Sequence, residues 1–160
     1  MSKWKVVLGQ YNRERWDGHE LEVSVDKIFK HPAYDDSEMD NDVALIKLST
    51  AVVFNDYMSP VCLPTGNDSV TYEGELAIVT GWGATIEGES CDSAAEEGGC
   101  RVGAYFQGDS GGPMVVRAGS KYNQVGVVSW GYGCARDGYP GVYARMTHYT
   151  EWVTQIVAAN

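Results

Sequence analysis

The chain has 160 residues, 44% hydrophobic and 21% charged, which is the balance of a globular domain long enough to bury a core. Acidic residues outnumber basic ones by 22 to 12, and the formal net charge is −10. We expect no nucleic-acid partner, because phosphate binding requires a basic surface. We expect no membrane span, because no apolar run of the sequence reaches the roughly 18 residues that one needs.

Short apolar or alternating runs, separated by clusters of Gly, Pro, Asn and Asp, predict a chain built mainly of β-strands. The 19 glycines fit many tight turns, and several short strands with regular turns are typical of a barrel or sandwich. The predicted strands lie in WKVVLG (4–9), LEVSVDKIFK (21–30), VALIKL (43–48), ELAIVTGW (75–82), PMVVR (113–117), QVGVVSW (124–130) and GVYARM (141–146).

The end of the chain predicts a helix whose single apolar stripe caps the core. In contrast, residues 83–103 are small, acidic and glycine-rich, which predicts a loop or a partly disordered segment. The helical stripe consists of Tyr149, Trp152, Val153, Ile156 and Val157.

The stretch GDSGGP, residues 108–113, places a serine between glycines. Acyl transfer by serine needs a hydroxyl on a sharp turn, a base that takes its proton, and donors that meet the oxyanion. Glycines permit strained backbone dihedrals and leave space around the hydroxyl of Ser110. The amides of Gly108 and Ser110 could then point at one place. On these six residues alone, a nucleophile and a serine in an ordinary β-turn both remain open.

Four further stretches surround GDSGGP, and all five together resemble the trypsin/chymotrypsin-like serine protease family (peptidase family S1). The resemblance runs from about Val6 to the C-terminus. The four stretches are DNDVALIKL (40–48), LAIVTGWGAT (76–85), VGVVSWGYGCA (125–135) and YPGVYARM (139–146).

The resemblance implies an all-β fold: an incomplete trypsin-like double β-barrel of antiparallel Greek-key strands with a C-terminal α-helix. Residues 1–160 would form a single partial domain. Within it, about 1–82 would be a remnant of the first barrel and the start of the second. Residues 83–107 would be a shortened acidic loop, and 108–160 the end of the second barrel and the helix.

The resemblance also implies a role for each matching residue. Ser110 is expected to be the nucleophile, and Asp42 the carboxylate that orients the base. Gly108 and Ser110 would supply the oxyanion amides. Asp109 matches a buried carboxylate that, in active members, pairs with a freed N-terminus.

Further matching positions concern the substrate. Ser129, Trp130 and Gly131 match a strand that aligns a substrate peptide by backbone pairing. Gly131 and Gly141 match the small walls of the primary specificity pocket. Ala104 falls at the base of that pocket, where trypsin-like members carry an aspartate, so trypsin-type specificity is not expected.

The chain departs from the family in its histidines. The family order is histidine, aspartate, serine, and the histidine lies in an Ala-Ala-His-Cys run that this sequence lacks. His19, His31 and His148 are all expected at the surface. We therefore expect no general-base histidine and an inactive chain. The family's first strands and its activation site have no counterpart in this sequence either.

Four cysteines, Cys62, Cys91, Cys100 and Cys134, are candidates for disulfides, and the three possible full pairings remain open. Because none has CxxC spacing, a zinc site is not expected. The resemblance places Gln10, Asn12, Asp17 and Glu20 near a calcium-binding loop. Calcium binds several carboxylate or carbonyl oxygens, and Gln10 stands where acidic residues are typical, so calcium near Asn12, Asp17 and Glu20 is only a weak expectation and no other cofactor is expected.

Two functions follow from the resemblance. The first is a serine endopeptidase domain acting on a polypeptide substrate or bound by a polypeptide inhibitor, secreted as in the family although this sequence shows no signal peptide. The alternative is a non-catalytic, protease-like binding or regulatory module. A missing N-terminal segment, or a separate chain that supplies the histidine, is a third hypothesis.

Overall fold

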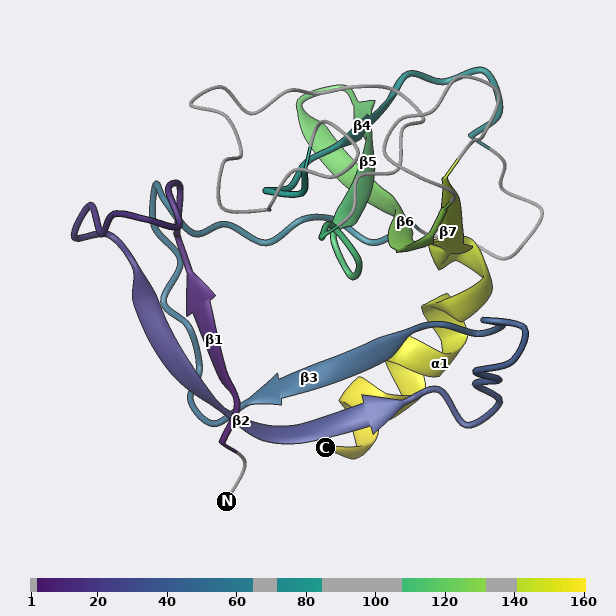
Figure 1. Cartoon of the computed structure of the whole chain (residues 1–160), viewed down its shortest axis with the longest axis horizontal. Coiled ribbons are helices and arrows are strands. Elements are labelled where there is room, and N and C mark those ends of the chain that lie inside the picture. Colours follow the sequence, from purple (N-terminus) through teal and green to yellow (C-terminus); the bar gives the residue numbers. More distant parts are fainter. Residues whose placement is uncertain (1–2, 65–71, 85–107, 132–140) are drawn as a thin grey trace. The chain divides into compact units, whose positions relative to one another are not determined.

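The structure is a computed structural model, and it describes residues 3–64, 72–84, 108–131 and 141–160. Across these ranges the chain forms seven β-strands in two antiparallel sheets and one C-terminal α-helix (Figure 1). The chain divides into two compact units. No helix of the described part is long and apolar enough to cross a membrane.

The first unit, Met1–Tyr34 with Ala44–Pro60, contains a three-stranded sheet in the order β1-β2-β3. The middle strand alternates apolar and polar residues, so Val23 and Val25 are buried while Ser24 between them is exposed. A register shift after Val25 interrupts this alternation. The strands are β1 (Lys5–Leu8), β2 (Leu21–Lys30) and β3 (Ala44–Leu48).

The core of the first unit is small. Among its described residues, only Val23 and Val25 are buried hydrophobic side chains, at 4% and 5% exposure. Larger apolar side chains such as Ile28, Ile46 and Phe54 are 43%, 51% and 60% exposed. Since stabilisation scales with the apolar area removed from water, this sheet gains little from burial.

The second unit, Asp35–Val43 with Val61–Asn160, contains a four-stranded antiparallel sheet in the order β4-β5-β6-β7. A two-residue turn at Gly119 joins β5 to β6, and its φ of +63° is a conformation that glycine adopts without strain. The strands are β4 (Ala77–Val79), β5 (Pro113–Ala118), β6 (Lys121–Trp130) and β7 (Val142–Arg145).

The second unit holds most of the core. Three neighbouring strands contribute Val79, Val116 and Val128, each 4% exposed or less. Helix α1 (Met146–Ala159) follows β7 directly and packs against β6. Its buried side chains include Tyr149 and Val153, which lie four residues apart and therefore on one helical face.

The predicted fold class is confirmed: each of the seven predicted apolar runs overlaps one observed strand, and the C-terminal helix is present. One detail of the helical stripe is wrong, because Val157 is 69% exposed. It lies in the last turn of α1, where no described element covers it. Most of the predicted acidic loop, residues 85–107, lies outside the described residues.

We predict that Val128→Ala lowers the free energy of unfolding by about 2 kcal/mol, because it deletes two methyl groups from a fully buried site. Urea denaturation followed by tryptophan fluorescence measures the change. Val157→Ala, the same substitution at an exposed site, is the matched control and should change stability by less than about 0.5 kcal/mol. Equal effects of the two substitutions would contradict the placement of the core at β6.

Candidate functional site

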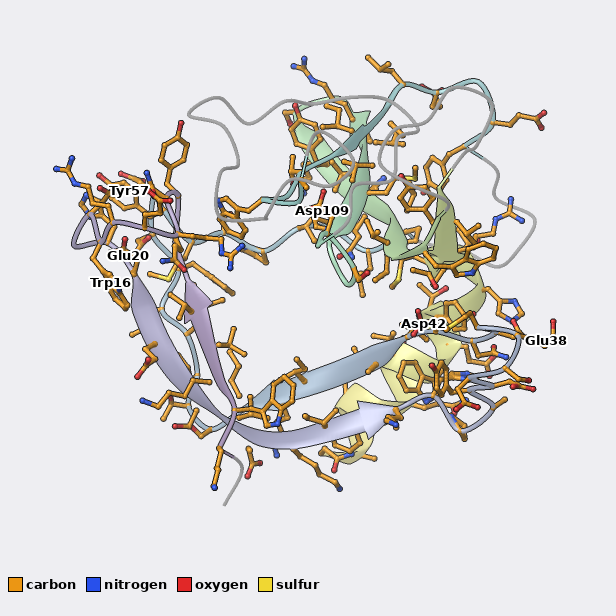
Figure 2. The ribbon with its side chains drawn as sticks, viewed as in Figure 1. Trp16, Glu20, Glu38, Asp42, Tyr57 and Asp109 are labelled. Atoms are coloured by element: carbon orange, nitrogen blue, oxygen red, sulfur yellow. The ribbon has the colours of Figure 1, made fainter. Side chains whose placement is uncertain are left out.

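Ser110 lies in the turn that precedes β5, and Figure 2 shows the side chains around this turn. Gly108 has a φ of +104°, a conformation that would strain any residue with a Cβ. The turn is fixed by backbone hydrogen bonds from Gly111 to Val128 (2.8 Å) and from Gly112 to Asp109 (2.7 Å). The expected sharp, glycine-dependent turn is therefore present, with Ser110 exposed upon it.

Ser129 of β6 bonds both predicted catalytic side chains. The Ser110 hydroxyl donates to the Ser129 carbonyl at 3.3 Å. The Ser129 hydroxyl donates to Asp42 Oδ2 at 2.6 Å. The predicted nucleophile and the predicted orienting carboxylate therefore both bond Ser129, one through its backbone carbonyl and the other through its side-chain hydroxyl. Sequence reasoning assigned Ser129 only to substrate alignment and missed its contact with Asp42.

The Asp109 carboxylate is buried, at 7% exposure, against two glycines. The Gly83 amide donates to its Oδ1 at 2.7 Å. A Cβ on Gly81 would overlap this carboxylate, and one on Gly83 would lie 2.7 Å from its Cγ. The stretch TGWG therefore leaves the space that Asp109 occupies.

Burial raises the pKa of Asp109, and the hydrogen bond from Gly83 opposes this only in part. Within the described residues, no cation lies at ion-pair distance from the carboxylate. A buried carboxylate without a cation is costly. The pKa of Tyr143 is raised by burial first, and then by the negative charge of Asp109.

The amides expected to meet an oxyanion belong to Gly108 and Ser110. Among the described residues, neither amide donates a hydrogen bond to a protein acceptor.

A cavity of about 500 Å³ borders Asp42 and Ser129. Tyr149 of α1 also lines it, and its hydroxyl donates to Asn41 Oδ1 at 3.4 Å, next to Asp42 in the chain. The pKa of Tyr149 is raised by burial first, and then by the negative charges of Asp40 and Asp42. Tyr149 had been predicted only as a core residue of the helix, because its apolar spacing gave no sign of this polar contact.

The remaining predicted substrate positions are only partly described. Trp130 and Gly131 are half-buried at the end of β6, and Gly141 is half-buried before β7. Cys62 is half-buried and lies opposite Asn123 of β6 in an isolated bridge: its amide donates to the Tyr122 carbonyl (3.1 Å) and its carbonyl accepts the Gln124 amide (2.8 Å). Ala104 and three of the cysteine candidates, Cys91, Cys100 and Cys134, lie outside the described residues.

The three histidines are all described. His19 stacks on Tyr57 with ring centroids 3.6 Å apart, and His31 accepts a weak bond from the Ala33 amide, both in the first unit. His148 lies in the second unit, exposed and edge-on to Tyr149, and it lines the cavity. Within this unit, His148 bonds neither Ser110 nor Asp42, whose polar contacts are to Ser129.

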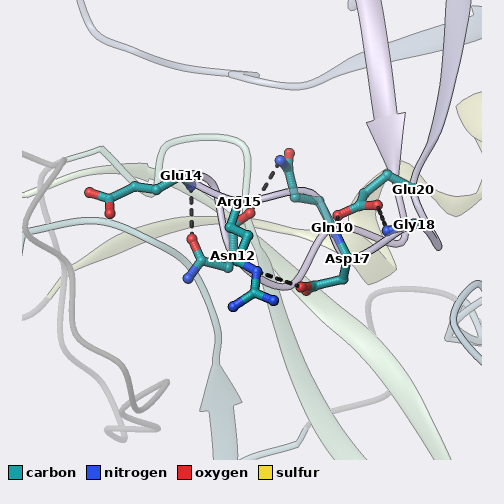
Figure 3. A network of polar contacts seen from close by, with 7 residues as sticks. All are labelled: Gln10, Asn12, Glu14, Arg15, Asp17, Gly18 and Glu20. Carbon is teal, nitrogen blue, oxygen red and sulfur yellow. Dashed lines mark hydrogen bonds and ion pairs between the residues drawn. The ribbon is translucent and has the colours of Figure 1, made fainter.

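The loop where calcium was considered is closed by its own hydrogen bonds (Figure 3). The two carboxylate oxygens of Glu20 accept the amides of Asp17 at 2.7 Å and Gly18 at 2.9 Å. Asn12 Oδ1 accepts the Glu14 amide at 2.8 Å. The hydrogen bonds from the Asp17 amide, the largest cause, and from the Gly18 amide lower the pKa of Glu20. The oxygens of Asn12 and Glu20 thus accept loop amides, and Asp17 Oδ1 lies 3.9 Å from Arg15 Nε, an arrangement that does not fit a calcium ion.

We predict that calcium leaves the thermal midpoint unchanged, whereas Glu20→Gln lowers it. The substitution removes the charge that two loop amides bond, and charged acceptors form the stronger hydrogen bonds. Differential scanning calorimetry with calcium and with a chelator measures both effects. Glu75→Gln, at an exposed carboxylate outside this loop, is the control. A midpoint that rises with calcium would show that the loop rearranges to bind the ion.

We predict that Asp109→Asn stabilises the protein at pH 7. Because the folded pKa of Asp109 lies above its ordinary value of 3.8, the folded state binds more protons than the unfolded state between those two values. Stability therefore falls as pH rises through that window. The advantage of the variant should grow through the same window and vanish below it, as measured by urea denaturation from pH 3 to 8.

Asp35→Asn serves as the control of opposite sign. The pKa of Asp35 is lowered, mainly by the Ser37 hydroxyl and then by the Ser37 amide. Its charge is favoured in the folded state, so the substitution should destabilise the protein at pH 7 and lose its effect at low pH. If both variants shifted stability in the same direction, the assignment of Asp109 as an unpaired buried charge would be wrong.

Comparisons with known proteins identify the family of this chain. A model of the family described as Trypsin matches residues 1–153. Trypsin I-P1 of Gallus gallus is 33% identical over 187 residues, covering 99% of this chain and 73% of that protein. Trypsin-2 of Salmo salar is 35% identical, covering 98% of this chain and 77% of that protein. Trypsin-1 of Astacus astacus is 35% identical, covering 93% of this chain and 73% of that protein. This chain therefore belongs to the trypsin family of serine proteases.

Proposed function

We propose that the chain is a serine-type endopeptidase domain in which Ser110 is the acylated nucleophile and Asp42 the orienting carboxylate. The observation that carries this proposal is the pair of hydrogen bonds through Ser129, at 3.3 Å to Ser110 and 2.6 Å to Asp42. The substrate would be a polypeptide aligned along Ser129, Trp130 and Gly131, with its oxyanion at the amides of Gly108 and Ser110.

We propose further that this domain is nearly inactive by itself, because the Ser110 hydroxyl bonds no basic side chain among the described residues of its unit. A serine hydroxyl is a poor nucleophile until a neighbouring group takes its proton. The group that accepts the Ser110 hydroxyl is a backbone carbonyl, which cannot become protonated at neutral pH. Loss of a triad member leaves about 10³–10⁴-fold acceleration over water, supplied by the oxyanion site and binding.

The buried Asp109 supports the same reading. In active members a freed N-terminus pairs with this position, whereas here burial leaves the carboxylate without a cation among the described residues. An unpaired charge one residue before Ser110 favours a zymogen-like turn. Extracellular location and disulfides remain part of the proposal through the family resemblance.

The alternative is a non-catalytic binding or regulatory module. One observation favours it: the Ser110 hydroxyl donates its hydrogen bond to a protein carbonyl, as expected of a serine that takes no part in catalysis. Such a module would hold a peptide along the end of β6 without cleaving it.

A fluorophosphonate probe separates the two functions. We predict that wild-type protein is labelled about 10⁶-fold more slowly than a complete trypsin run beside it, the loss that removal of a triad histidine causes, and that Ser110→Ala is not labelled. Ser120→Ala, in the exposed turn between β5 and β6, is the matched control and should label like wild type. No labelling of wild-type protein at all would favour the binding module, and labelling at the full rate would mean that a base is present.

A further inference from the structure

A smaller cavity, of about 350 Å³, is lined by neither Ser110 nor Asp42. Its volume lies at the lower end of the usual range for ligand pockets. All of its described lining residues belong to the second unit, so the cavity does not depend on how the two units sit. These residues are Tyr72, Glu73, Val125, Arg145 and Thr147.

A tight turn before β4 presents one charged side chain to this cavity. The turn is closed by a hydrogen bond from the Glu75 amide to the Tyr72 carbonyl at 3.1 Å. Gly74, its third residue, has a φ of +81°, which a side chain at this position would make costly. The turn therefore fixes the backbone of Glu73, the residue that lines the cavity.

A β-bulge supplies the apolar part of the wall. Val115 pairs with Gln124 and Met114 pairs with Gly126, so Val125 is an extra residue on β6. A bulge bends its strand and redirects the side chains beside it, and bulges are frequent next to functional sites. The cavity thus lies at an irregular point of the sheet.

The start of α1 supplies the positive part of the cavity (Figure 1). Arg145 precedes the first helical residue, and its side chain makes no capping hydrogen bond. The first turn of the helix contains no acidic residue. Because the first amides of a helix carry partial positive charge and have no partner within the helix, this end favours an anion. The guanidinium of Arg145 adds a full positive charge at the same place.

The Thr147 hydroxyl is a second, independent sign of a ligand at this end of the helix. The residue is 3% exposed, and its Oγ1 has no hydrogen-bond partner among the described residues. A buried hydroxyl without a partner is costly, and such groups are rare in folded proteins. Since Thr147 lines the cavity, a ligand oxygen bound there would be a partner for it.

Two opposite charges line this cavity without meeting. Among the described residues, neither Glu73 nor Arg145 forms an ion pair. A ligand with a single charge would be attracted by one of these side chains and repelled by the other. A ligand that carries both charges is attracted by both, provided that its two charged groups are held apart by a short chain.

We propose that this cavity binds a small ω-amino acid as a zwitterion. Its carboxylate lies at the start of α1, beside Arg145 and Thr147, and its ammonium lies at Glu73. Its methylene chain contacts the apolar surface that Tyr72 and Val125 provide. The site is separate from the proposed catalytic residues, and the inference does not rest on the proposed function.

The test is isothermal titration of the full chain with β-alanine, γ-aminobutyrate and ε-aminocaproate, which differ only in the length of the chain between the charges. We expect one saturable site, with a single preferred length. The preferred compound should bind about fivefold more tightly than the matching acid without the amine and the matching amine without the acid, because each lacks one ion pair with an exposed side chain. Saturable binding by none of the three, or equal affinity for the matching acid, would overturn the proposal.

Glu73→Gln is the decisive variant, because Glu73 lines this cavity and not the larger one beside Asp42. It should reduce the affinity for the ω-amino acid to that of the matching acid and leave binding of the acid unchanged. Glu75→Gln, an exposed carboxylate of the same turn that does not line the cavity, is the matched control. Equal effects of the two substitutions would show that the ammonium does not lie at Glu73.

The carboxylate end is tested by Arg145→Gln and by Thr147→Val, which keeps the shape of the side chain and removes the hydroxyl. Both should weaken the ω-amino acid and the matching acid alike, because both compounds carry the carboxylate. Arg117→Gln, at an exposed arginine of β5, should change neither. Unchanged affinity in Arg145→Gln and Thr147→Val would overturn the placement of the ligand at the start of α1.

Ser110→Ala separates this inference from the proposed function. It should bind the ω-amino acid as wild type does, because Ser110 does not line the cavity. Fluorophosphonate labelling of wild type without any saturable binding would refute the ω-amino acid site and leave the proposed function intact. Saturable binding that depends on Glu73 would support the site whether or not Ser110 is labelled.

Discussion

The candidate site depends on Ser129, because one residue holds the hydroxyl of Ser110 with its carbonyl and the carboxylate of Asp42 with its side chain. The strand pairing explains why Ser129 can do so. The register of β6 with β7 shifts between Val128 and Trp130, so Ser129 falls at an irregularity of the ladder. Such irregularities free a residue from regular pairing and redirect its polar groups, and they often lie beside active sites.

A second constraint acts on the turn before Ser110. The Asp109 carboxylate fits between Gly81 and Gly83 only because neither has a side chain. This burial fixes Asp109, and the hydrogen bond from Gly112 to its carbonyl fixes the following residues. The geometry around Ser110 is therefore maintained by backbone hydrogen bonds and glycines, at the cost of burying a carboxylate, and that burial raises the pKa of Asp109.

The sequence was sufficient for the parts of the fold that local patterns encode. All seven strands and the helix follow from apolar runs, turn residues and helical spacing, whereas the roles of Ser110 and Asp42 were predicted only through the family resemblance. The contact between Ser129 and Asp42 joins residues 87 positions apart, and no local pattern records which way a serine points on a strand. The prediction that Val157 is buried was wrong for a related reason. Helical spacing indicates which residues share a face, but not how far the sheet that covers this face extends.

The polar groups of Ser110 and Asp42 are satisfied locally, by bonds to Ser129. A hydrogen bond to a charged group contributes about 1.5–3 kcal/mol, and Asp42 has such a bond from Ser129. Ser110 likewise donates to a carbonyl instead of remaining unpaired. Neither side chain therefore needs a hydrogen bond to a third residue to keep its position. A chain can keep the arrangement of these two side chains even when its catalysis is weak. Asp109 is different: it accepts the Gly83 amide but faces no cation among the described residues, so the cost of its burial falls on the turn that carries Ser110.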